Sequence, residues 1–146
     1  MTAALLVTPE FNLVAPAPVR GPRLGPKTVL VADDDHDARD LIAFRLQSVG
    51  YDVVTADNGH EALALTRRLL PDLLVLDVSM PGMDGIEVCY RLHEIPETAD
   101  IPVIVVSARA QRTDIDLAYA AGAEDFLAKP FQATILLQRV GWLVVG

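Results

Sequence analysis

The sequence predicts an α/β fold: a doubly wound (βα)5 domain, a three-layer sandwich with a five-stranded parallel sheet between two layers of helices. Five short apolar runs rich in β-branched residues alternate with segments of helical period. The runs are apolar throughout, which is typical of parallel strands covered by helices on both faces. Four of them lead into acids, a serine or a lysine, the residue types that build a site at the carboxyl edge of such a sheet.

The first predicted strand is Thr28–Ala32. A helix is expected after it, because four apolar residues recur on one helical face: Ala38, Ile42, Leu46 and Val49. Gly50 follows as the C-terminal stop of this helix.

The second and third predicted strands are Tyr51–Ala56 and Leu73–Leu76. Each is followed by a segment with the form of a capping box, Asn58-Gly59-His60-Glu61 and Asp84-Gly85-Ile86-Glu87. In this form a side-chain acceptor caps the helix and a glutamate three residues on reaches back to it. We therefore expect helices to begin at both places.

The fourth and fifth predicted strands are Ile101–Val106 and Asp125–Ala128. The helix between them is indicated by three residues on one side: Ile115, Ala118 and Ala121. It is expected to stop at Gly122, and a last helix to start near Phe131.

The chain's 146 residues suffice for one domain with a core, but not for two ordinary ones. Residues 1–26 hold five of the ten prolines, so we expect a flexible tail there, with a partner-docking segment as the alternative, and a domain over 27–146. Residues 1–27 carry a balance of +2, so residues 28–146 carry −10. An acidic body repels phosphate backbones, which argues against direct nucleic-acid binding and favours a cation site.

A cytoplasmic location is expected. The single Cys89 excludes an internal disulfide, and its apolar surroundings on a predicted helix favour a buried side chain over a reactive thiol. The apolar stretch Ala3–Val7 is too short for a signal peptide and has no basic residue before it. No run approaches the ~20 apolar residues of a membrane span, so no membrane contact is expected.

Asp33 and Asp34 are adjacent carboxylates at the end of the first strand. Their repulsion is costly unless a cation or a proton relieves it. Mg²⁺ does so with two or three carboxylates, because it prefers oxygen ligands and retains several waters. Asp35 is expected only to cap the helix that follows.

Asp77 is delivered to the sheet edge by the third strand and has no cation beside it in sequence. Next to a bound cation it would stay ionised and could attack phosphorus to form an acyl phosphate. The loop after it contains a Pro-Gly turn that bends the backbone over the site, so a carbonyl such as that of Ser79 could complete the metal shell.

Ser107 and Lys129 follow the fourth and fifth strands. A hydroxyl can donate to a phosphoryl oxygen, and a lysine can neutralise one. Lys129 is one of two lysines in the chain, and Pro130 fixes the turn after it. The three histidines have no partners at metal-ligand spacing, so surface or capping roles are expected for them.

Four segments together resemble the receiver domain of two-component response regulators. They are Val29–Asp35, Leu74–Gly85, Val105–Ala108 and Gly122–Phe131. The resemblance covers about residues 27–140 and implies a CheY-like strand order of 2-1-3-4-5.

The resemblance also implies functions for these residues. Asp77 would accept a phosphoryl group from a sensor histidine kinase or phosphotransfer protein, with Mg²⁺ held by Asp33, Asp34, Asp77 and the carbonyl of Ser79. Ser107 and Lys129 would contact the phosphoryl oxygens. Ser107 and Phe126 would form the switch that remodels the face of the fourth helix, fifth strand and fifth helix, where a downstream protein or a second copy would bind. Ser79 and Arg109 lie at positions that tune acyl-phosphate lifetime.

Two other functions are weighed against this signalling module. An aspartate-nucleophile phosphatase needs an acid two residues after the nucleophile, and Ser79 occupies that position, so no enzyme turnover is expected. A phosphate-independent interaction or dimerisation scaffold would have little reason to keep the complete acid set. The apolar end, Gly141–Gly146, leaves three alternatives open: a truncated end, a strand-like extension or a self-association patch.

Overall fold

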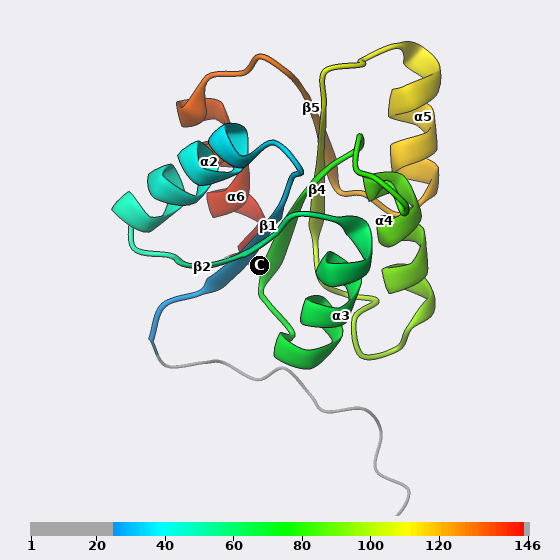
Figure 1. The fold of residues 1–146 in the computed structure, drawn as a ribbon. Coiled ribbons are helices and arrows are strands. Elements are labelled where there is room, and N and C mark those ends of the chain that lie inside the picture. The colour runs from blue at the N-terminus through cyan, green and yellow to red at the C-terminus, as the bar shows by residue number, and fades with distance from the viewer. Residues whose placement is uncertain (1–24, 145–146) are drawn as a thin grey trace, which may run out of the picture.

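The computed structural model describes residues 25–144. The predicted tail over residues 1–26 therefore lies almost wholly outside the described residues. Within residues 25–144, five strands and five helices alternate (Figure 1). The strands are β1 (Thr28–Ala32), β2 (Asp52–Ala56), β3 (Leu73–Asp77), β4 (Val103–Ser107) and β5 (Asp125–Ala128). The helices are α2 (His36–Ser48), α3 (Gly59–Leu69), α4 (Gly85–Glu94), α5 (Arg112–Ala120) and α6 (Ala133–Val144).

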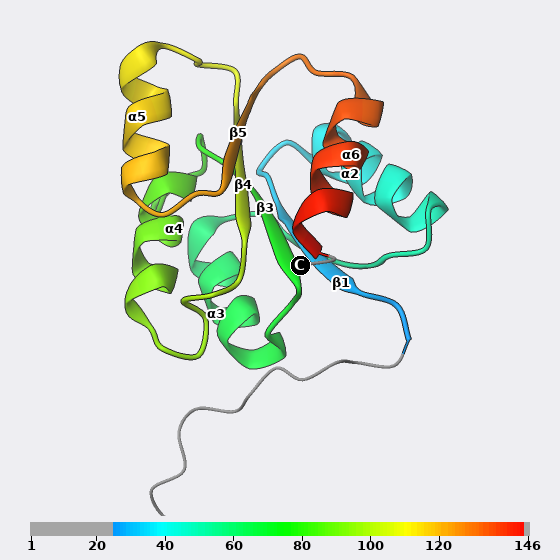
Figure 2. The same cartoon turned by 180° about the vertical axis from the view of Figure 1, so that it is seen from behind.

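The strands form one parallel sheet in the order β2-β1-β3-β4-β5, which confirms the predicted topology. Helices α2 and α6 cover one face and α3, α4 and α5 cover the other (Figures 1 and 2). All carboxyl ends of the strands consequently meet at one edge of the sheet.

The core has two layers, one on each side of the sheet. Alternate residues of the central strands enter each layer, so Leu74 and Leu76 pack with α4 while Val75 packs with α2 and α6. Strands β3 and β4 are buried along their whole length, as the apolar runs predicted. The edge strands β2 and β5 are only partly buried, so burial on both faces was a wrong expectation for them.

Side-chain caps start three of the helices where the sequence predicted them. Asp35 accepts hydrogen bonds from the N–H groups of Asp37 and Ala38, and Asn58 and Asp84 accept from Glu61 and Glu87. The return bonds of the two predicted capping boxes are not formed. The Glu61 carboxylate accepts from the Asp57 N–H, and that of Glu87 accepts from Arg91.

The boundaries differ from the prediction at a few places. Val49 is the C-cap residue after α2 and is 57% exposed. The sequence had placed it on the buried face of the helix, and that expectation was wrong. Strand β4 begins two residues later than predicted and includes Ser107. Helix α6 runs through Val144, which excludes the strand-like extension up to that residue. None of the helices among the described residues could cross a membrane.

Candidate functional site

Three carboxyl groups gather at the carboxyl edge of the sheet, where the sequence predicted a metal site. Asp33 and Asp34 follow β1, and Asp77 is the last residue of the neighbouring strand β3. Each offers an oxygen within 4.8 Å of the others. Asp33 and Asp77 are 1% and 5% exposed, whereas Asp34 faces solvent. A cation could therefore enter from the side of Asp34.

Lys129 reaches the same point from the loop that connects β5 to α6. Its Nζ lies 2.8 Å from Asp33 Oδ2 and 3.2 Å from Asp77 Oδ1. Residues far apart in the sequence thus meet as predicted, because the strand order places β5 only two strands from β3. Only 23% of the Lys129 side chain is exposed, so its charge is directed into the cluster.

The charges in this cluster are not balanced. Burial and the neighbouring Asp33 raise the pKa of Asp77 from 3.8 to about 6, although Lys129 acts in the opposite direction. Burial lowers the pKa of Lys129, but its contacts with Asp33 and Asp77 outweigh this and the net shift is upward. Three carboxyl groups facing one ammonium leave an excess of negative charge. The donor set therefore fits a hard divalent cation such as Mg²⁺.

The β3–α4 loop is pressed closely against the helices beside it. A Cβ on Gly85 would lie 2.2 Å from the carbonyl oxygen of Asp77, and one on Gly59 would lie 2.0 Å from that of Met83. Only glycine fits at these contacts. Ser79 lies exposed in this loop, two residues after Asp77, and its carbonyl remains a predicted metal ligand.

Ser107 is the last residue of β4 and is 1% exposed. Its Oγ accepts a hydrogen bond from the Arg109 N–H at 3.0 Å, and its carbonyl accepts one from the Lys129 N–H at 2.8 Å. The hydroxyl residue and the lysine are therefore joined through the backbone. Phe126 lies on β5, half-buried against the core beneath α4 and α5, and its role as a switch stays a prediction.

Sequence reasoning missed two side chains near this site. Arg39 bridges the end of β1 to α2, with Nη1 donating to the Asp33 carbonyl at 3.4 Å and Nη2 2.9 Å from His36 Nδ1. Asp114 is a buried carboxylate on α5 that accepts from the Arg109 guanidinium. The only signals in the sequence were an arginine one turn after the acids and an acid three residues after Gln111.

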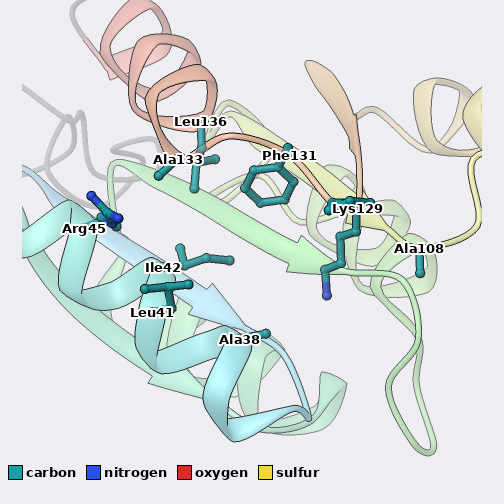
Figure 3. Close-up of a pocket in the computed structure, with 10 residues that line it drawn as sticks. Ala38, Leu41, Ile42, Arg45, Ala108, Lys129, Phe131, Ala133 and Leu136 are labelled. Atoms are coloured by element: carbon teal, nitrogen blue, oxygen red, sulfur yellow. The ribbon is translucent and has the colours of Figure 1, made fainter.

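A mostly apolar cavity of about 560 Å³ opens beside Lys129 (Figure 3). It lies between α2 and the start of α6, and Leu41, Ile42, Phe131 and Leu136 supply much of its wall. Leu41 and its neighbour Phe44 are 58% and 64% exposed. An exposed apolar surface thus lies directly next to the charged cluster.

The model of the response regulator receiver domain family matches residues 29–141. The chain belongs to this family. It is 42% identical over 112 residues to the DNA-binding dual master transcriptional regulator RpaA of Synechocystis, covering 77% of this chain and 46% of that protein. It is 38% identical over 112 residues to the phosphate regulon regulator PhoB of Rhizobium meliloti, covering 77% and 49%.

Solved structures agree with this assignment. A putative response regulator from Chloroflexus aurantiacus has a TM-score of 0.79 and 36% identity, covering 83% of this chain and 99% of that chain. The receiver domain spans about half the length of RpaA and PhoB. Receiver domains are signalling modules of two-component systems, and this domain is one of them. Receiver domains in general interact with histidine kinases or phosphotransfer proteins.

Proposed function

We propose that Asp77 accepts a phosphoryl group from a phosphohistidine and that the receiver domain thereby switches its protein contacts. The observation that carries this proposal is the meeting of Asp33, Asp34 and Asp77, with the Lys129 ammonium in contact with Asp33 and Asp77. In the transfer, an Asp77 carboxylate oxygen attacks phosphorus. The phosphorus–oxygen bond forms as the phosphorus–nitrogen bond to the imidazole breaks. The imidazole carries a proton on its other ring nitrogen and therefore leaves as the neutral ring.

The residues around Asp77 have separate roles in this step. Asp33, Asp34, Asp77 and the carbonyl of Ser79 would hold Mg²⁺, which supplies positive charge to the phosphoryl oxygens and keeps Asp77 ionised. Lys129 neutralises a further oxygen as a point charge, and the Ser107 hydroxyl donates a hydrogen bond to another. All five side chains lie at a strand end or within two residues of one, so little reorganisation is needed when charge develops.

The acyl phosphate on Asp77 is the product of this reaction and not an intermediate in the turnover of an external substrate. Rapid hydrolysis of a phosphoester would need a general acid near the leaving group, and Ser79 occupies the position where related chemistry places one. A phosphohistidine donor and the unpaired, buried Cys89 both suit a cytoplasmic location.

We further propose that the phosphodonor protein docks along α2. The apolar cavity has Leu41 and Lys129 in its wall (Figure 3), and Phe44, on the same helix as Leu41, is exposed as well. A donor seated there would bring its histidine to the open side of Asp77. Small donors such as acetyl phosphate would not need this surface.

The test is incubation with acetyl phosphate and Mg²⁺, followed by intact mass measurement. We expect one added phosphoryl group on the native chain and none on Asp77→Asn. An unchanged mass of the native chain, with unchanged NMR spectra in beryllofluoride, would instead support the phosphate-independent scaffold. Multiple turnover of a phosphoester would support a phosphatase.

A further inference from the structure

We infer that Asp114 and Arg109 form a positioning pair that holds the Ser107 hydroxyl in place for the phosphoryl group on Asp77. Neither residue touches the reacting atoms, and both act through Ser107. The inference rests on the proposed function, because it concerns how one donor of that site is oriented. The two residues lie in the β4–α5 connection and the first turn of α5.

Asp114 is unusual because it is a charged residue buried on the outer layer of the fold. Its side chain is 8% exposed. One carboxylate oxygen accepts from Arg109 Nη2 at 2.8 Å, and the other accepts from the Gln111 N–H at 3.2 Å. A buried carboxylate is costly unless such bonds satisfy it. The pair therefore fixes the loop between Ser107 and α5 in one conformation.

This loop holds Ser107 directly. The Arg109 N–H donates to Ser107 Oγ at 3.0 Å, and the Ser107 carbonyl accepts from the Lys129 N–H at 2.8 Å. Because the Ser107 oxygen accepts from the backbone, its own proton remains available to another acceptor. A serine hydroxyl held in one rotamer is a preorganised donor, whereas an unrestrained serine side chain populates three staggered rotamers. Loss of the pair should therefore weaken phosphoryl binding about threefold or more.

Helix α5 supplies a matched control. Arg112 and Asp116 form a second arginine–aspartate pair on the same helix, 3.5 Å apart, with side chains 88% and 65% exposed. Asp116→Asn removes the same charge as Asp114→Asn without touching the β4–α5 loop. The control thus separates a general electrostatic effect from an effect on Ser107.

The experiment measures the affinity for beryllofluoride, a phosphoryl mimic, with saturating Mg²⁺ by NMR titration. We expect Asp114→Asn and Arg109→Ala to bind it about threefold or more weakly and Asp116→Asn to bind it like the native chain. In a Ser107→Ala background neither Asp114→Asn nor Arg109→Ala should cause any further loss. The affinity for Mg²⁺ alone should not change.

The outcomes separate this inference from the proposed function. If the native chain binds no beryllofluoride, the proposed function is wrong. If the native chain binds it but the variants do so equally well or more tightly, only the positioning role is wrong. If Asp114→Asn and Arg109→Ala lower the affinity for beryllofluoride as much in the Ser107→Ala background as in the native chain, Asp114 and Arg109 have a merely structural role. Should Asp114→Asn fail to fold, Arg109→Ala decides, since that side chain is 72% exposed.

Discussion

Asp77 is held in an environment that disfavours its charge until a cation arrives. Burial and the neighbouring Asp33 raise its pKa from 3.8 to about 6, so between these two pH values the folded chain binds a proton there that the unfolded chain has lost. The metal-free domain should consequently lose stability as the pH rises from about 4 to above 6. Bound Mg²⁺ would reverse this effect, because it would stabilise the ionised carboxylate.

The pH dependence can be measured by urea unfolding of the metal-free native chain and of Asp77→Asn between pH 4.5 and 7.5. Relative to the native chain, Asp77→Asn should gain about 1–3 kcal/mol of unfolding free energy across this range. Saturating Mg²⁺ should reduce the difference. If the difference in unfolding free energy between the native chain and Asp77→Asn is the same at pH 4.5 and pH 7.5, the raised pKa of Asp77 is wrong.

Asp34 is the exposed member of the carboxyl cluster, and its proposed role in metal binding can be tested separately from any role in folding. Asp34→Ala should weaken Mg²⁺ binding by more than about tenfold. Removing a residue that only supports a metal ligand already lowers metal affinity by about this factor, and removing a ligand itself should lower it at least as much. It should leave the fold intact, since it also relieves repulsion. Calorimetric titration and thermal unfolding test both statements.

A suitable control for this experiment is Asp37→Ala, which removes an exposed acid from the first turn of α2. It should leave Mg²⁺ affinity nearly unchanged. If Asp34→Ala unfolds the chain, Asp34 is a structural acid and not a ligand.

At the scale of the elements, α2 carries the surface proposed for the phosphodonor. Leu41→Ala should slow phosphotransfer from a histidine kinase that phosphorylates the native chain by about fivefold or more, because the variant loses an apolar contact at the docking surface. Labelling by acetyl phosphate should stay the same, because a small donor does not use the surface. Rates of both reactions can be followed by phosphate-affinity gel electrophoresis.

Leu117→Ala provides the comparison, since Leu117 is 57% exposed on α5 and so matches Leu41 in type and exposure. It should leave both rates unchanged. Equal slowing by the two variants, or slowing of the acetyl phosphate reaction, would exclude α2 as the docking element.

The elements also show what could be predicted from the sequence. The five strands, their order and the edge at which Asp33, Asp77 and Lys129 meet follow from apolar periodicity and from the resemblance to a family. The edge strands were judged too buried, because an apolar run does not tell how many neighbours a strand has. Asp114 was missed because a buried acid near a helix start has the same sequence pattern as an exposed cap.

At the scale of the whole molecule, one face combines apolar exposure with a charged pair. Leu117, Tyr119 and Trp142 are 57%, 46% and 62% exposed on α5 and α6. Arg139 of α6 pairs with Asp125 of the edge strand β5 and lies 5.9 Å from the ring of Trp142 on the same helix. This is the face for which the sequence suggested a homodimer or a downstream partner, and that suggestion stays a prediction.

We expect beryllofluoride and Mg²⁺ to shift the chain towards a dimer through this face. Trp142→Ala should weaken the association about tenfold, because a large aromatic side chain would be buried there. Light scattering after size-exclusion chromatography measures the masses. Phe44→Ala, which removes an exposed aromatic ring from α2, should leave the dimer unchanged. If the chain stays monomeric under all conditions, the dimer prediction is wrong, and a downstream protein remains as the expected partner of this face.

The buried Cys89 also has a practical consequence. Burial raises the pKa of its thiol to about 12, and its Sγ lies 3.5 Å from the Ala121 carbonyl oxygen, so it should resist maleimides in the native state. A second cysteine placed at an exposed position could then be coupled alone to a fluorophore or spin label. Movements of α5 against α2 could be followed in an otherwise natural chain.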